Sequence, residues 1–183
     1  MHLRRGFLLL LVAAPLEAVA SFPLLSKIDI DKARIDAEVA KRFPVEVRWL
    51  DTLDVAAGNP RLTLLAASNR VRADLDLVAG RRVLLQAVRG KLALAGALRF
   101  EPKDASLRYA QVSVERLTLH GLPDALAPEA TRLGAFLAER LLDDLVLYRL
   151  DERQKAGLNL AGVRPGEIRV TEQGLTVLLE AAK

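Results

Sequence analysis

Residues 88–100, VRGKLALAGALRF, decide the fold of this chain. Apolar residues recur there at every second position, which is the period that places side chains on one face of a β-strand. The residues of this face are Val88, Gly90, Leu92, Leu94, Gly96, Leu98 and Phe100. Glycine inside a strand is typical of a bend or of a close approach between backbones. We therefore predict a long strand in a sheet that curves strongly.

The same period of two continues on both sides of this strand. It predicts further strands at about residues 45–55, 62–77 and 112–119. Residues 58–60 (Gly-Asn-Pro) are typical of a turn, and the apolar parity reverses across residues 66–69, which indicates a bulge or a local break. Consecutive strands with short connections favour an antiparallel meander.

Helical periods complete the predicted fold. After Pro123 a helix of roughly 20 residues is expected, because apolar residues recur at a spacing of three or four. Its apolar residues are Leu126, Ala130, Leu133, Phe136, Leu137, Leu141, Leu142 and Leu145. A shorter helix is expected at 31–42 and a hairpin at 167–179. The predicted fold class is α+β: a strongly curved antiparallel meander sheet of about four long strands wrapped around a long C-terminal helix, with a short N-terminal helix and a C-terminal hairpin.

The N-terminal residues have the composition of a secretory signal. Two arginines precede the apolar run 6–14, and Pro15 ends this run. The residues predicted at the cleavage site are Ala18, Ala20 and Ser21. An uncleaved membrane anchor is disfavoured, because the run has about half of the roughly 20 apolar residues that a spanning helix needs. The paired arginines leave both Sec and twin-arginine export open.

Cleavage would divide the precursor into a signal peptide, 1–20, and a single domain, 21–183. This remainder is long enough for one hydrophobic core. We expect the domain to work in the periplasm. The chain contains no cysteine, so the sequence predicts a domain that is not anchored through a lipid-modified cysteine.

Neither charge nor residue types point to nucleic acid or to catalysis. The net charge of +4 arises from 27 basic and 23 acidic residues, which are interspersed. After cleavage His120 is the one histidine, beside a glycine that is typical of a turn. Asp143 and Asp144 point apart on a helix, as on a solvated face. The chain has no Gly-x-Ser-x-Gly motif. We predict a protein that is not an enzyme, with no cofactor, no metal and no nucleic-acid partner.

Several short stretches together resemble a known family. They are KRFP at 41–44, NPRL at 59–62, NRV at 69–71, LYRL at 147–150 and VRPGEI at 163–168. Their order, over about residues 26–180, resembles the YceB-like family of bacterial envelope proteins, a domain of unknown function. The resemblance implies a fold similar to the tubular lipid-binding (TULIP) superfamily, in which an acyl chain can lie between a curved sheet and a helix. Many members carry a cysteine after the signal, whereas this chain has Ser21 there.

Two functions are left open. The first is a non-enzymatic periplasmic or cell-envelope protein that binds a lipid, a fatty-acyl chain or another long apolar ligand in the seam between sheet and helix. The residues predicted to line this seam are Val47, Trp49, Leu75, Leu92, Leu94, Leu98, Leu133, Phe136, Leu137 and Leu141. The second is an envelope scaffold or protein-interaction module, in which the same residues form a dry core. Peripheral contact with the membrane or with an envelope protein is compatible with both.

Overall fold

The computed structural model describes residues 26–49, 53–80, 88–120 and 127–182. The predicted signal peptide and its cleavage residues Ala18, Ala20 and Ser21 lie outside these residues. The strands are β1 (Lys27–Asp31), β2 (Val45–Trp49), β3 (Leu53–Leu65), β4 (Arg70–Gly80), β5 (Val88–Glu101), β6 (Ser106–Leu119), β7 (Val146–Arg149), β8 (Val163–Val170) and β9 (Gly174–Ala181). The helices are α1 (Lys32–Ala40), α2 (Ala127–Leu137) and α3 (Glu152–Ala161), with a 3₁₀ turn, η1 (Ala66–Ser68), and a π-helical segment, η3 (Ala138–Leu142).

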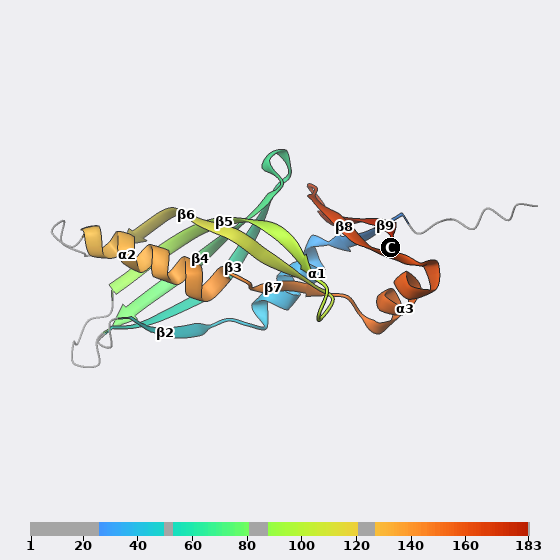
Figure 1. Ribbon diagram of the computed structural model, residues 1–183. Coiled ribbons are helices and arrows are strands. Elements are labelled where there is room, and N and C mark those ends of the chain that lie inside the picture. The colour runs from blue at the N-terminus through green and yellow to red at the C-terminus, as the bar shows by residue number, and fades with distance from the viewer. Residues whose placement is uncertain (1–25, 50–52, 81–87, 121–126, 183) are drawn as a thin grey trace, which may run out of the picture.

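The strands form two antiparallel sheets in an elongated molecule (Figure 1). The large sheet has the order β2-β3-β4-β5-β6-β7, so each strand is hydrogen-bonded to its neighbour in sequence. The small sheet has the order β1-β9-β8, which joins the first described strand to the last hairpin. The predicted antiparallel sheet of consecutive strands is therefore confirmed.

The predicted fold class was nevertheless wrong. The large sheet has six strands and not about four. The helical residues after β6 are α2 and η3, and β7, α3, β8 and β9 follow them. At 1.5 Å per residue these helical residues, 127–142, extend over about 24 Å, whereas the residues of β5 extend over about 46 Å. Within the described residues there is thus no long C-terminal helix wrapped by four strands.

One of the two extra strands comes from two hairpins that share β3 and that the apolar pattern does not show, and the other extra strand is β7. Trp49 of β2 lies opposite Leu53 of β3, so the expected strand at 45–55 is a hairpin. Leu65 of β3 lies opposite Arg70 of β4, so the expected strand at 62–77 is also a hairpin. Residues that are paired across an antiparallel ladder share a face of the sheet. The alternation therefore continues unchanged past the β2–β3 turn, where Trp49 pairs with Leu53, and reverses its parity at the β3–β4 turn, where Leu64 pairs with Val71.

Residues 58–60 form a bulge inside β3 and not the predicted turn. The register with β4 shifts between Gly58 and Arg61, and Asn59 has a φ of 50°. Asparagine tolerates this left-handed conformation better than most residues. The side chains of Asn59 and Arg61 each donate a hydrogen bond of 3.0 Å to Asp76 on β4. The hydrogen bond from Asn59, followed by that from Arg61, lowers the pKa of Asp76.

Asn69 joins the two sheets. It follows η1 with a φ of 52°. Its Nδ2 donates to the carbonyl of Ile168 at 2.9 Å, and its Oδ1 accepts from the backbone N–H of Val170 at 2.7 Å. The side-chain amide thus pairs with β8 as the peptide group of a neighbouring strand would. The β3–β4 turn is in this way bonded to the small sheet.

α3 is a helix that the sequence expectations did not include. Its N-terminus has a capping box, in which the side chain of Asp151 accepts from the backbone N–H of Gln154 and the side chain of Gln154 accepts from the backbone N–H of Asp151. Its C-terminus is followed by Gly162 with a φ of 63°. Both are common helix-terminating signals, present in the sequence. The helix expected at 31–42 is confirmed as α1.

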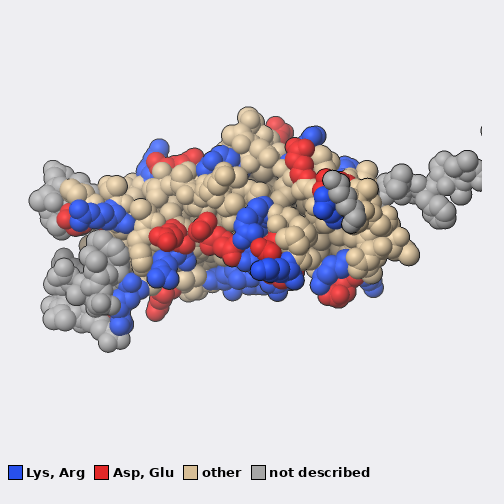
Figure 2. Space-filling model, viewed as in Figure 1, with Lys and Arg blue, Asp and Glu red and all other residues tan. Residues whose placement is uncertain are grey.

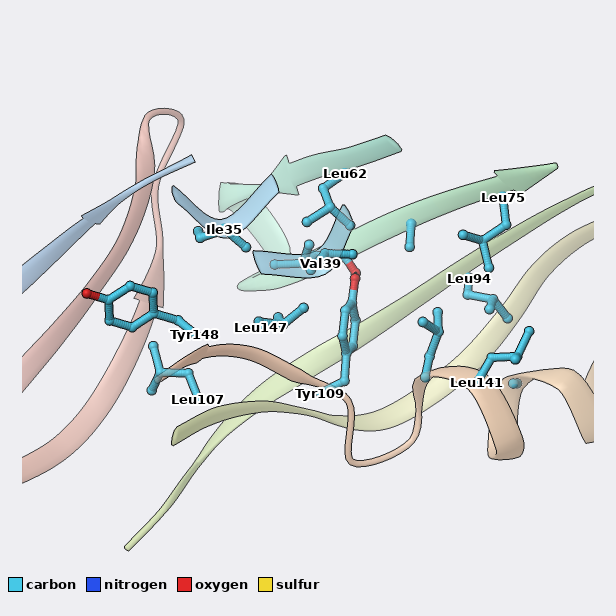
Figure 3. Close-up of a cluster of buried hydrophobic side chains, with 14 of the residues drawn as sticks. Ile35, Val39, Leu62, Leu75, Leu94, Leu107, Tyr109, Leu141, Leu147 and Tyr148 are labelled. Carbon is cyan, nitrogen blue, oxygen red and sulfur yellow. The ribbon is translucent and has the colours of Figure 1, made fainter. Parts of the chain in front are cut away.

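Tyr109 of β6 fills the centre of the core (Figure 3). A Cβ atom built on Gly96 would lie 2.4 Å from Cδ1 of this ring, so the ring occupies the space that the glycine leaves. The phenol donates a hydrogen bond of 3.0 Å to the carbonyl of Val71, and burial raises the pKa of Tyr109. Gly96 therefore accommodates an aromatic ring and does not open a cavity.

Ionic side chains tie the β5–β6 hairpin to β7. Asp104 accepts from the fully buried Ser106 at 2.6 Å, from Arg108 at 2.8 Å and from Arg149 at 3.0 Å. Asp144, just after η3, pairs with Arg108 as well. On the face drawn in Figure 2, acidic and basic side chains are likewise interspersed.

The pKa of Asp104 gives a pH prediction. The hydrogen bond from Ser106, followed by that from Arg108, lowers this pKa from 3.8 to about 2. A carboxyl group whose pKa is lower in the folded state stabilises the fold at pH values above its pKa in the unfolded chain. This stabilisation is lost as the pH falls toward the pKa of the group in the folded state. Wild type should therefore lose stability more steeply between pH 3.8 and about 2 than Asp104→Asn does. Urea unfolding at several pH values measures this, and parallel pH profiles would contradict it.

Candidate functional site

α2 and η3 present one side of large residues and one side of small residues. The large residues are buried at a spacing of four: Leu133, Leu137 and Leu141. The small residues on the side toward β6 are Gly134, Ala135 and Ala138. A Cβ atom on Gly134 would lie 3.3 Å from Cδ2 of Leu117 on β6. Because Gly134 has no side chain, the helix can approach the strand closely at this point.

A groove of about 330 Å³ lies between β6 and the helical residues of α2 and η3. Its apolar lining residues are Val112, Val114, Ala135 and Ala138. Its polar lining residues are Gln111, Glu139 and Asp143, which are all exposed. Val114 keeps 38% of its surface exposed, although it lies on the face of the sheet that α2 covers. The volume falls within the range of about 300–1,000 Å³ that is typical of small-molecule sites.

The wall of the groove on β6 is shaped by a bulge. The register between β5 and β6 shifts between Ala95 and Ala97, and Gln111 has a φ of 51°. From the other face of the sheet, Arg70 donates to the carbonyls of Ala95 at 2.8 Å and of Gln111 at 3.2 Å. The guanidinium group thus satisfies carbonyl groups that the bulge displaces from the regular ladder. A π-helical segment forms the opposite wall, and such segments are frequent at functional sites.

The described side chains that were predicted to line a seam do not line this groove. Those that are fully buried are Leu75, Leu92, Leu94, Leu133, Leu137 and Leu141. Those that are half-buried are Val47, Leu98 and Phe136. The side chain of Trp49 is outside the description. Leu75 lies directly opposite Leu92, and both belong to the core that the large side of α2 covers. None of the nine described side chains lines the groove.

The residues of the groove were not singled out from the sequence. Gly134, Ala135 and Ala138 do form a stripe of small residues beside the leucine stripe, and this was the signal available. Close approach of a helix needs such small residues, although they also occur on exposed helix faces. The stripe lies against β6 in the folded protein. No local pattern in the sequence determines that β6 takes this position.

Other hollows and clusters offer less to an apolar ligand. A larger hollow of about 610 Å³ lies beside β1 and the β8–β9 turn, where Lys27 and Thr176 both bind Asp29 at 2.7 Å. Its charged side chains are thus already partnered in part. No group of three histidine, cysteine, aspartate or glutamate side chains is placed to hold a metal ion in the part of the chain that the structure describes. None of the described helices has the length and apolarity to span a membrane.

Comparison with known proteins does not identify the chain. No protein-family model matches it, and no curated protein matches it.

Proposed function

We propose that this protein is a non-enzymatic binding domain that holds one long apolar chain, such as the acyl chain of a lipid, in the groove between β6 and the helical residues of α2 and η3. One observation carries the proposal: an apolar lining in which Val114 stays 38% exposed beneath a helix. A valine at such a position would gain by covering its side chain with another apolar group. The small side chains of Ala135 and Ala138 leave room for that group.

The expected affinity follows from the length of chain that the groove covers. Burial of a methylene group contributes about 0.8 kcal/mol. Ten covered methylenes would give about 8 kcal/mol, which the association cost of at least about 4 kcal/mol offsets in part. The remaining free energy of at most about 4 kcal/mol corresponds to a dissociation constant of about 1 mM. About two further covered methylenes would tighten binding tenfold, so the affinity rises with the length of chain that the groove covers.

The setting of this function is part of the proposal. An exported protein of the cell envelope is supported by the signal-like residues 1–20, and membership of the YceB-like family is supported by the ordered motifs between residues 41 and 168. Both support a location near membrane lipids, which contain the acyl chains that the groove would bind.

The test compares two exposed valines of the same sheet. Val114→Asn puts a polar group in the groove, and Val78→Asn makes the same change at a valine of β4 that is 44% exposed and does not line the groove. Uptake of a fluorescent fatty acid is measured by titration. We expect Val114→Asn to weaken binding about tenfold, because a buried amide without a partner costs about 1–3 kcal/mol. Val78→Asn should bind as wild type does.

The packed interior supports a second candidate, an envelope interaction module without a small ligand. Its observation is the fully buried Tyr109, whose ring fills the centre of the fold. If wild type takes up no fatty acid, or if the two asparagine variants bind equally, the groove is not the binding site and this second function is favoured. Recovery of one defined envelope protein by a delipidated sample would then support it.

A further inference from the structure

The outer face of β5 and β6 carries a second hollow, on the side of the sheet away from α2. Its volume is about 260 Å³. It is lined by Arg72, Asp74, Lys91, Ala93, Arg116, Thr118 and His120. Gly134 of α2 lies against Leu117. Arg116 and Thr118 are its neighbours in β6 and therefore face the opposite side. None of the lining residues belongs to the groove, so this site is separate from the proposed function.

The strand register brings hydrogen-bond donors together over a small residue. Arg116 lies opposite Ala93, and Thr118 lies opposite Lys91. Ala93 is only 4% exposed and has a short side chain, so it forms the bottom of the hollow. His120 follows two residues after Thr118 and lines the same hollow. A guanidinium, an ammonium, a hydroxyl and an imidazole thus surround one space.

The acidic residues at one side of the hollow are engaged by a single arginine. Arg72 binds Asp74 through Nη2 at 3.3 Å and approaches Glu115 through Nε at 3.3 Å. One guanidinium balances only one of the two carboxylate charges. Among the described residues, neither carboxylate forms an ion pair with Lys91 or Arg116.

Lys91 and Arg116 supply the positive charge of the hollow. Within the described residues neither forms an ion pair. Asp76 lies opposite Lys91 but already accepts hydrogen bonds from Asn59 and Arg61. Two cations on adjacent strands repel each other, and an anion placed between them would relieve this repulsion.

We propose that this hollow binds a phosphate group. The Arg116 guanidinium can donate two parallel hydrogen bonds to phosphate oxygens, and the Lys91 ammonium adds a compact charge. Thr118 of β6 and His120, just after the end of this strand, supply further donors. Phosphate offers several acceptor oxygens in different directions, which fits donors that surround a space. The group can belong to free phosphate or to the head group of a membrane lipid.

The first arm of the test uses inorganic phosphate and the full chain. Amide NMR shifts are followed during a titration with sodium phosphate, against sodium chloride at equal ionic strength. Saturable shifts at Thr118 and His120 are expected, and Arg116→Gln should weaken phosphate binding about tenfold. Arg153→Gln makes the same charge change on the exposed face of α3 and should leave binding unchanged. Lys91→Gln serves as a second variant of the site.

The second arm uses vesicles of phosphatidylcholine with and without phosphatidylglycerol, and measures co-sedimentation. Binding to phosphate that depends on Arg116, without vesicle binding, supports the site and assigns it to free phosphate. Vesicle binding that depends on Arg116 supports the site and assigns it to lipid head groups. The proposal is overturned if neither phosphate nor the vesicles bind. It is also overturned if Arg116→Gln and Arg153→Gln weaken binding to the same extent, since the effect would then come from the change in net charge.

Discussion

Gly96→Ala is expected to lower the free energy of unfolding by about 3 kcal/mol, at the upper end of what overpacking of a core costs. The new Cβ atom would lie 2.4 Å from Cδ1 and 2.8 Å from Cε1 of Tyr109, which is less than contact distance. The ring cannot move away freely, because it is fully buried and its hydroxyl is bonded to the carbonyl of Val71. Relief of the clash therefore breaks a hydrogen bond or displaces a strand.

The matched control is Gly80→Ala at the end of β4, where no described residue other than its chain neighbours lies within 4 Å of the new Cβ. Its effect should stay within about 0.5 kcal/mol. A second control introduces Gly96→Ala into Tyr109→Leu, where the smaller side chain should accept the methyl group and the cost should fall. Urea unfolding measures all variants. Equal losses for Gly96→Ala and Gly80→Ala would show that the ring does not fill the space at Gly96.

Asn69→Ala is expected to cost about 3 kcal/mol, because it leaves two groups of the β8 backbone without partners at about 1–3 kcal/mol each. These groups are the carbonyl of Ile168 and the N–H of Val170, which the amide of Asn69 now binds at 2.9 and 2.7 Å. This loss of stability should be accompanied by faster amide hydrogen exchange in β8, since the two hydrogen bonds of Asn69 join the small sheet to the β3–β4 turn.

Asn59→Ala is the control for the backbone. Asn59 has a φ of 50° and Asn69 a φ of 52°, so alanine meets the same left-handed conformation at both positions. The side chain of Asn59 donates only to Asp76, which is half-buried. The difference between the two variants therefore isolates the contacts to β8. If both cost the same, Asn69 matters for the turn alone and does not join the sheets.

The period of the strands was readable in the sequence, but their ends were not. The strand at 88–100 is correct because its alternation is long and is limited by the turn at 102–104. The β3–β4 hairpin was read as one strand with a break, because Asn69 turns the chain without a glycine or proline. Residues 58–60 were read as a turn for the opposite reason: their Gly-Asn-Pro sequence serves a bulge. The same residue types thus occur in turns and in bulges, and only the pairing between strands distinguishes the two structures.

The candidate groove shows where sequence reasoning ends. The leucines of α2 were recognised as a buried stripe, and they are buried. The role of Tyr109 was not predictable, since only the pairing of β5 with β6 brings its ring over Gly96. The groove depends in the same way on contacts between β6 and the small side of α2. Contacts between distant segments place both features, and no period along the chain encodes them.

Native mass spectrometry of the gently purified full chain tests the central claim most directly. The groove between β6 and α2 is expected to hold one apolar chain, so the spectrum should contain a species heavier by a single lipid or fatty acid. Added fatty acid should convert the ligand-free species into this one, and Val114→Asn should reduce the conversion. A spectrum that is uniformly ligand-free before and after the addition would contradict the claim.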